Sequence, residues 1–133
     1  MPKFGDELHH FGWNACSSAL CPYAPHPHVE RRYLVVPGIR SSRIHIIDTK
    51  PDPRKPQIVK VIEPEEVFAR TNYSRPHTIH CGPEAIYVSA LGDPSGDGPG
   101  GIFMRSSSDT VTNLKPLPSS SSKVEGIASI VPG

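Results

Sequence analysis

Two short stretches of the chain combine residue types that could do chemistry together. Residues 6–18 hold two carboxylates, two adjacent histidines, the only tryptophan and a cysteine. Residues 77–81 hold His77, His80 and Cys81. Imidazole and thiolate groups suit copper and zinc, and neither the helical nor the strand period explains the first stretch. The sequence therefore predicts a metal or thiol site built from both stretches, with the rest of the chain as its scaffold.

The histidines and Cys81 are candidate metal ligands. Adjacent residues on a strand point to opposite faces, so we expect only one of His9 and His10 to ligate, and the alternative is a solvated pair. His77 and His80 would also face opposite sides of a regular strand, whereas a turn or bulge could bring them together. Otherwise their imidazoles would hydrogen bond to backbone. A Cys81 thiolate would bind soft Cu(I), or the side chain is a small buried hydrophobic group.

Two carboxylates and two further cysteines accompany these ligands. Asp6 and Glu7 could orient a ligating imidazole or act in proton transfer, and the alternative is a solvated turn. Cys16 and Cys21 could bind selenium or a soft metal, or form a reversible disulfide. The alternative is a structural Cys16 and an idle, exposed Cys21.

Composition limits the classes of protein to consider. The chain has 133 residues, enough for one small domain, and its net charge of +1 with dispersed basic residues argues against a nucleic-acid or anionic-membrane surface. No apolar run approaches the roughly 20 residues of a membrane-spanning helix, and residues 1–5 lack the apolar core of a signal peptide. Three cysteines, two of them beside histidine clusters, favour a reduced compartment, and we expect a cytoplasmic protein.

Sixteen prolines and eleven glycines favour short strands joined by turns over long helices. β-branched and aromatic residues predict strands at 31–36, 43–48, 57–62, 85–91 and 102–105. Proline followed by two acidic residues predicts a short helix over 64–70. We expect a turn over 71–76 and a glycine-rich loop over 92–101.

The two halves of this pattern resemble each other. Residues 33–35 align with residues 86–88, and in each half a segment with histidine and cysteine precedes the strands. A four-stranded unit that recurs every roughly 40–50 residues is typical of β-propeller blades. The first strand of a blade lines the central channel, so both clusters would face one axis. From Ser106 onward, serine runs predict a weakly ordered tail.

The first stretch also resembles a known motif. Residues 6–18 read Asp-Glu-Leu-His-His-x-Gly-Trp-Asn-x-Cys-Ser-Ser, which is similar to the pattern of the selenium-binding protein family, whose members include methanethiol oxidases. The resemblance covers roughly residues 5–104. Its further blocks lie at 34–37, 41–44, 60–64, 77–81, 89–93 and 100–101.

The resemblance implies a seven-bladed β-propeller with a metal near its axis. It also implies a copper-dependent oxidase that converts methanethiol, oxygen and water into formaldehyde, hydrogen sulfide and hydrogen peroxide. Many relatives carry two cysteines separated by two serines, whereas four residues separate Cys16 from Cys21, which departs from a tight redox pair. Because family members are several times longer, the resemblance implies an N-proximal piece of such a protein.

The predicted fold is therefore all-β, with a partial β-propeller of about two four-stranded blades over 1–105 and a disordered tail over 106–133. Three functions follow as hypotheses. The first is a truncated methanethiol oxidase, inactive alone, with copper held by the histidines and Cys81. The second is a non-catalytic selenium- or soft-metal-binding protein on the same scaffold. The third is an interaction fragment or non-functional product with exposed sheet edges.

Overall fold

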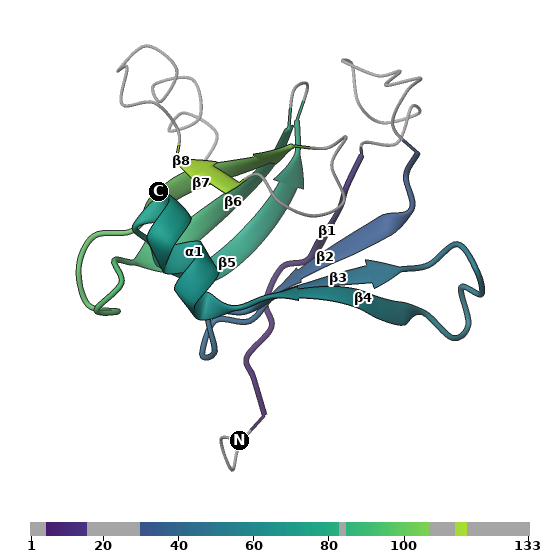
Figure 1. Cartoon of the computed structure of the whole chain (residues 1–133), viewed down its shortest axis with the longest axis horizontal. Coiled ribbons are helices and arrows are strands. Elements are labelled where there is room, and N and C mark those ends of the chain that lie inside the picture. The colour runs from purple at the N-terminus through teal and green to yellow at the C-terminus, as the bar shows by residue number, and fades with distance from the viewer. Residues whose placement is uncertain (1–4, 16–29, 83–84, 107–113, 117–133) are drawn as a thin grey trace.

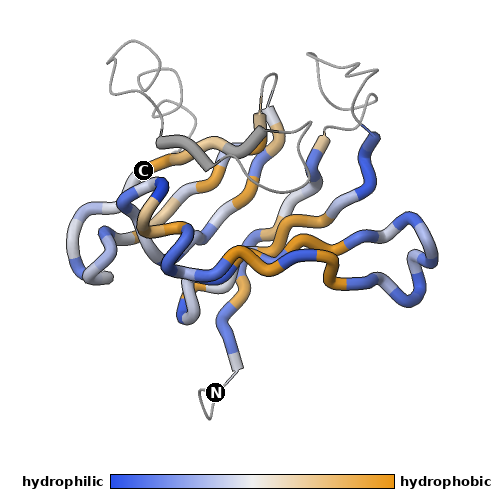
Figure 2. The backbone as a smooth tube through the Cα atoms, in the orientation of Figure 1, coloured by the Kyte–Doolittle hydropathy of each residue, from blue (hydrophilic) through white to orange (hydrophobic). Residues whose placement is uncertain are grey.

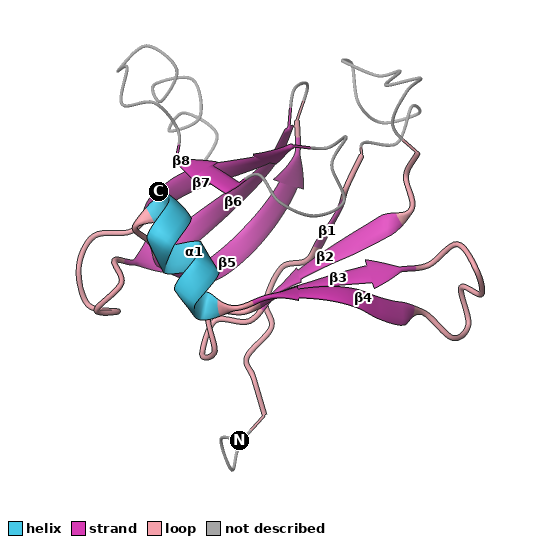
Figure 3. Cartoon of the chain, in the orientation of Figure 1, coloured by secondary structure: helices cyan, strands magenta, loops and turns pink. Residues whose placement is uncertain are grey.

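A computed structural model of the chain describes residues 5–15, 30–82, 85–106 and 114–116, which form two four-stranded sheets and a short helix (Figures 1 and 3). The first sheet contains, in order, β1 (Gly12–Trp13), β2 (Tyr33–Pro37), β3 (Ile44–Asp48) and β4 (Gln57–Ile62). Helix α1 (Pro64–Thr71) leads to the second sheet. That sheet contains, in order, β5 (Ser74–Cys81), β6 (Ala85–Gly92), β7 (Gly101–Ser106) and β8 (Leu114–Pro116). Every neighbouring pair is antiparallel, so each sheet is a meander, as predicted for a blade.

Local sequence accounts for most of these elements. The strands β2, β3, β4, β6 and β7 match the predicted strands to within two residues at each end. The predicted helix is also confirmed. It begins at Pro64, carries acidic residues in its first turn, and ends where Asn72 takes a left-handed conformation with φ 59°. No helix in the described ranges is long and apolar enough to cross a membrane.

The structure corrects the sequence-based expectation in two places. Residues 71–76 are not all turn, because β5 begins at Ser74. Pro76 is tolerated in this strand because β5 is the first strand of its sheet and pairs with β6 alone within it. Strand β8 lies in the stretch expected to be weakly ordered, and it pairs with β7. The remainder of the predicted tail, residues 107–113 and 117–133, lies outside the described residues.

One apolar core joins the two sheets. In Figure 2 hydrophobic residues follow the strands of both sheets, while the β3–β4 connection is hydrophilic. On β3, Ile44 and Ile46 are buried and the intervening His45 is half-buried, as expected for a strand with one face toward a core. The first strands of the sheets, β1 and β5, contact each other. The core residues are Val35, Ile44, Ile46, Ile62, Val67, Ile79, Ile86, Val88, Ala90 and Phe103.

Gly12 allows β1 and β5 to approach closely. A Cβ atom at this position would lie 2.7 Å from the carbonyl oxygen of Ile79 and 2.8 Å from its Cγ2 atom. Both distances are well inside van der Waals contact. The absence of a side chain at residue 12 therefore sets the spacing between the two sheets at their first strands.

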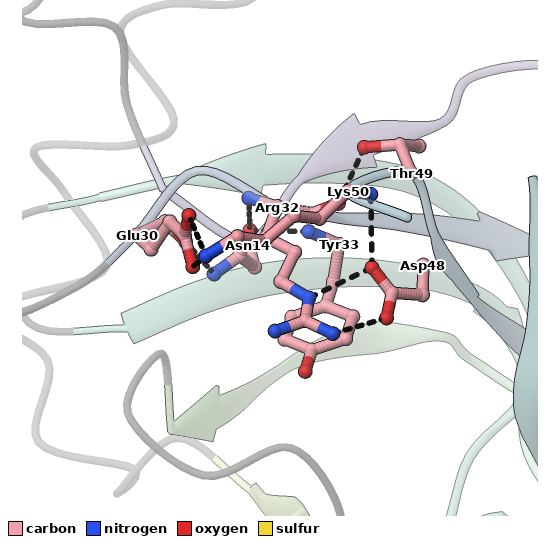
Figure 4. A network of polar contacts seen from close by, with 7 residues as sticks. All are labelled: Asn14, Glu30, Arg32, Tyr33, Asp48, Thr49 and Lys50. Carbon is pink, nitrogen blue, oxygen red and sulfur yellow. Dashed lines mark hydrogen bonds and ion pairs between the residues drawn. The ribbon is translucent and has the colours of Figure 1, made fainter. Parts of the chain in front are cut away.

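A polar network fastens the end of the first sheet opposite the β2–β3 hairpin (Figure 4). The buried side chain of Asn14 accepts hydrogen bonds from the amides of Arg32 and Tyr33 and donates one to the carbonyl of Glu30. The guanidinium of Arg32 donates to both carboxylate oxygens of Asp48. These hydrogen bonds lower the pKa of Asp48 to about 2. The network therefore ties the residue that follows β1 to the start of β2, and the start of β2 to the end of β3.

Replacing Gly12 by alanine tests the close approach of the two sheets. The added methyl group would meet the backbone of Ile79, and overpacking of this kind costs roughly 1–3 kcal/mol. We expect the free energy of unfolding in urea to fall by that amount. Gly5→Ala is the matched control, because nothing lies within 4 Å of a Cβ built there. Equal stability of the two variants would contradict the close contact.

Acid denaturation tests the pair of Arg32 and Asp48. The pKa of Asp48 is about 2 in the folded chain, below its ordinary 3.8, so the pair stabilises the fold above about pH 4 and this stabilisation is lost as the pH falls toward 2. We expect Asp48→Asn to lower Tm at neutral pH and to flatten the profile of Tm between about pH 4 and pH 2. Asp52→Asn, in an exposed turn where Asp52 accepts from the amide of Arg54, should keep the wild-type profile. An unchanged acid profile in Asp48→Asn would refute the assignment.

Candidate metal centre

Three imidazoles from distant parts of the chain meet beside β1 and β5. Phe11 separates His9 and His10 from β1, and His77 lies on β5. The ring centroids of His9 and His77 are 5.0 Å apart, those of His10 and His77 are 5.2 Å apart, and those of His9 and His10 are 6.4 Å apart. Nδ1 of His9 lies 3.0 Å from Nε2 of His77. We call His9, His10 and His77 the histidine trio.

Both members of the adjacent pair lie close to His77, although strand alternation would separate them. The reason is that residues 5–11 are not part of a strand, since β1 begins only at Gly12. The expectation that His9 and His10 point to opposite faces therefore does not apply to this segment. Both rings are available to one site.

A β-bulge sets the position of His77. Pro76 is paired with Ala90 and Thr78 with Ser89, so His77 is the extra residue of β5 between these two pairs. A bulge interrupts the alternation of side chains and re-aims the residue that it contains. It places His77 against His9, whereas the sequence indicates a bulge only as a way to bring His77 and His80 together.

His80 and Cys81 lie farther along β5. His80 is exposed opposite Tyr87, and Cys81 is a half-buried free thiol opposite Ile86. No hydrogen bond or ring contact within the described part of the chain joins either residue to the trio. The structure thus brings together three of the five candidate metal ligands. Two further candidates, Cys16 and Cys21, lie outside the described residues.

The trio fits a metal by donor type, and the pair of His9 and His77 also fits by spacing. Metal-bound imidazole nitrogens lie about 2.0–2.1 Å from zinc, which puts two nitrogens of a tetrahedral site about 3.3 Å apart. The observed 3.0 Å between Nδ1 of His9 and Nε2 of His77 is only slightly shorter. As they stand, no three His, Cys, Asp or Glu side chains within the described ranges form a group that could hold a metal ion. A metal would therefore have to replace the hydrogen bond between His9 and His77.

The surroundings favour the neutral form of His77. Burial lowers the pKa of His77, and the neighbouring rings of His9 and His10 lower it further. A neutral imidazole can offer a lone pair to a metal, whereas an imidazolium cannot. The half-buried position of His77 thus suits a ligand better than a surface histidine would.

Asp6 anchors the segment before β1 to the β2–β3 hairpin. Its carboxylate accepts hydrogen bonds from the amides of Arg40 and Ser41, both at 3.1 Å, and from the hydroxyl of Ser41. Burial raises the pKa of Asp6, but these hydrogen bonds outweigh it and the pKa falls below its ordinary value. Gly38 makes room for the carboxylate, since a Cβ there would collide with an oxygen of Asp6.

Glu7 bridges Arg40 and His9. One carboxylate oxygen accepts from Nε of Arg40 at 3.0 Å, and the other contacts Nε2 of His9 at 2.9 Å. The hydrogen bond from Arg40, followed by that from His9, lowers the pKa of Glu7, so the group is a carboxylate at neutral pH. A carboxylate on one ring nitrogen fixes the tautomer and orientation of a metal-binding histidine. Glu7 therefore holds His9, while Asp6 holds the hairpin.

Sequence reasoning missed three residues of this site. Arg40 and Ser41 lie in a turn, and nothing in their spacing indicates contact with carboxylates more than thirty positions earlier. Thr78 places Oγ1 2.6 Å from Nδ1 of His77. A hydroxyl directly beside a candidate ligand is the signal that could have identified Thr78.

Known proteins are similar to this chain in sequence. Residues 1–115 match the family described as 56kDa selenium binding protein. The chain is 47% identical over 110 residues to Selenium-binding protein 2 of Arabidopsis thaliana, and 48% identical over 105 residues to a methanethiol oxidase of Xenopus laevis. These matches cover 82% and 78% of this chain, but 22% and 21% of the relatives.

The fold also matches a solved structure. The X-ray structure of a hypothetical selenium-binding protein from Sulfolobus tokodaii superposes with a TM-score of 0.74 at 62% identity, covering 87% of this chain and 25% of that chain. The chain thus spans about a fifth of the length of the curated relatives that it matches. Two successive four-stranded meanders and this superposition confirm the predicted partial β-propeller.

Removing the carboxylate of Asp6 tests whether the hairpin holds the segment that carries His9. In Asp6→Ala the amides of Arg40 and Ser41 lose their acceptor, so we expect their hydrogen exchange to accelerate about tenfold, equivalent to about 1.4 kcal/mol. The ring signals of His9 should shift as well. Asp93→Ala is the control. It removes a carboxylate that accepts hydrogen bonds within its own loop, from the amides of Ser95 and Gly96. Unchanged exchange in Asp6→Ala would show that the hairpin does not depend on this anchor.

Proposed function

The chain belongs to the 56kDa selenium binding protein family, and we propose that it supplies the metal-binding part of a copper-dependent methanethiol oxidase. The proposed reaction converts methanethiol, oxygen and water into formaldehyde, hydrogen sulfide and hydrogen peroxide. The observation that carries the proposal is the histidine trio, in which three imidazoles converge beside the first strands of two blades. The Xenopus laevis relative, named methanethiol oxidase, supports the small thiol as substrate.

Copper is the metal that the donor set favours. Imidazole suits copper, and among divalent first-row metals Cu²⁺ binds most tightly to a given nitrogen site. When bound, copper would supply a centre that takes a thiol sulfur as thiolate and exchanges electrons with oxygen. His9, His10 and His77 would hold it.

The side chains around the trio prepare it for such a metal. Glu7 holds the ring of His9 by Nε2, which leaves Nδ1 directed toward His77. The half-buried His77 is kept neutral by its surroundings. Leu8 and Phe11, which flank the histidine pair in sequence, are exposed apolar side chains. Their exposed surface would be open to apolar contact with the methyl group of a small thiol.

A non-catalytic selenium- or soft-metal-binding protein is the second candidate. Cys81 favours it, because this residue is a free, half-buried thiol on the same strand as His77. The Arabidopsis thaliana relative is named Selenium-binding protein 2. A cytoplasmic location belongs to both candidates, since a reducing compartment would preserve the thiol.

Titration with Cu(I) against a chromogenic chelator tests the metal site. We expect one tightly bound Cu(I) per chain. His77→Gln should weaken binding by at least the roughly 10–100-fold that loss of an outer hydrogen-bond partner costs, because it removes a ligand itself. His45→Gln is the matched control, since His45 is a half-buried histidine of β3 outside the trio. Equal affinity of the two variants would refute the trio as the copper site.

A peroxide assay separates the two candidate functions. Release of hydrogen peroxide that depends on both methanethiol and copper supports the oxidase. Stoichiometric uptake of copper or selenium without peroxide, by a protein of the relatives' full length that contains this sequence, supports the binding protein. For the 133-residue chain alone we expect uptake without turnover, because it spans about a fifth of the length of the oxidase relatives.

A further inference from the structure

A chain of hydrogen bonds runs in one direction from Thr78 to Glu7. The carboxylate of Glu7 can only accept, so Nε2 of His9 donates to it at 2.9 Å. In a neutral His9, Nδ1 then accepts, and Nε2 of His77 donates to it at 3.0 Å. In a neutral His77, Nδ1 accepts in turn, and the hydroxyl of Thr78 donates to it at 2.6 Å. The carboxylate of Glu7 thus decides the position of every proton in this series of hydrogen bonds.

This arrangement leaves one nitrogen ready for a metal and one blocked. Nδ1 of His9 presents a lone pair toward His77. The nitrogen that faces it, Nε2 of His77, carries a proton. A metal between the two rings needs a lone pair from each, so His77 must move its proton to Nδ1 before it can ligate.

We propose that Thr78 permits this change by reversing its hydrogen bond to His77. The hydroxyl of Thr78 rotates from donating to Nδ1 of His77 to accepting from it. His77 loses one proton at Nε2 and gains one at Nδ1 by exchange with water, so the ring stays neutral and releases no net proton. A hydroxyl suits both states because it is donor and acceptor at once. The inference rests on the proposed metal site and makes Thr78 a positioning residue.

The position of Thr78 fits this role. It follows His77 directly, where the bulge ends and regular pairing with Ser89 resumes. The side chain is half-buried, and its branching at Cβ restricts rotation about χ1. The oxygen is therefore held near the ring while the hydroxyl proton remains free to turn.

Long-range nitrogen–proton correlation spectra of the histidine rings test the tautomers directly. In the metal-free chain at neutral pH we expect His9 and His77 both to carry their proton on Nε2. After addition of Cu(I), which is diamagnetic, His77 should carry it on Nδ1, while His9 should keep it on Nε2. A proton on Nδ1 of His77 before copper is added, or on Nε2 afterwards, would overturn the inference.

Paired variants test the hydroxyl. Thr78→Val keeps the branched shape and removes the hydroxyl, so we expect the affinity for Cu(I) to fall about tenfold, the lower end of the cost of losing an outer partner. Thr78→Ser restores the hydroxyl and should bind within about twofold of wild type. Thr49→Val is the matched control, because it removes a hydroxyl that donates to the carbonyl of Arg32 at 2.7 Å. Equal affinity of Thr78→Val and Thr78→Ser would overturn the inference.

The two proposals fail in different ways. If wild type takes up no Cu(I), or if His77→Gln binds it as tightly as wild type, the metal site is wrong and the role of Thr78 falls with it. If wild type binds through the trio and the Thr78 variants bind equally well, the metal site stands and only the role of Thr78 is refuted.

Discussion

The close approach of β1 to β5 is the contact on which the site depends. Gly12 lies directly against the backbone of Ile79, two positions beyond His77 on β5. His9 and His10 lie shortly before Gly12 in the sequence. The packing of the two sheets therefore fixes the distances from their imidazoles to that of His77. The apolar core that joins the sheets therefore positions polar groups that are not part of it.

Sheet packing alone would leave the segment before β1 without a fixed course. Residues 5–11 belong to no strand, and Asp6 and Glu7 provide the hydrogen bonds that a sheet would otherwise supply. Both carboxylates use the same turn of the β2–β3 hairpin. The hairpin thus acts as a second support that holds His9 from the side opposite His77. A site built from an irregular segment needs such anchors because its backbone makes no ladder hydrogen bonds of its own.

The sequence predicts what depends on local pattern and misses what depends on register. The β-branched residues of 57–62 predict the bounds of β4, and the proline followed by acidic residues predicts α1. The bulge that aims His77 depends on how β5 pairs with β6, which residue types alone do not decide. Contacts such as that of Ser41 with Asp6 join positions far apart in the chain, so no periodicity reveals them. The repeated order of histidine segment and strands nevertheless predicts that the two clusters meet.

The hydrogen bond between His9 and His77 explains why these two imidazoles can lie together without a preformed metal site. It holds the two rings 3.0 Å apart, slightly closer than two ligands of one metal would be. A hydrogen bond of this kind contributes only about 1 kcal/mol net, far less than the roughly 10–16 kcal/mol with which small zinc domains bind their metal through cysteine and histidine ligands together. A metal that replaces this hydrogen bond therefore gives up little free energy. Without a metal, the same hydrogen bond keeps the two rings aligned. In the proposed mechanism, alignment without metal and ligation with metal differ by one proton position on His77.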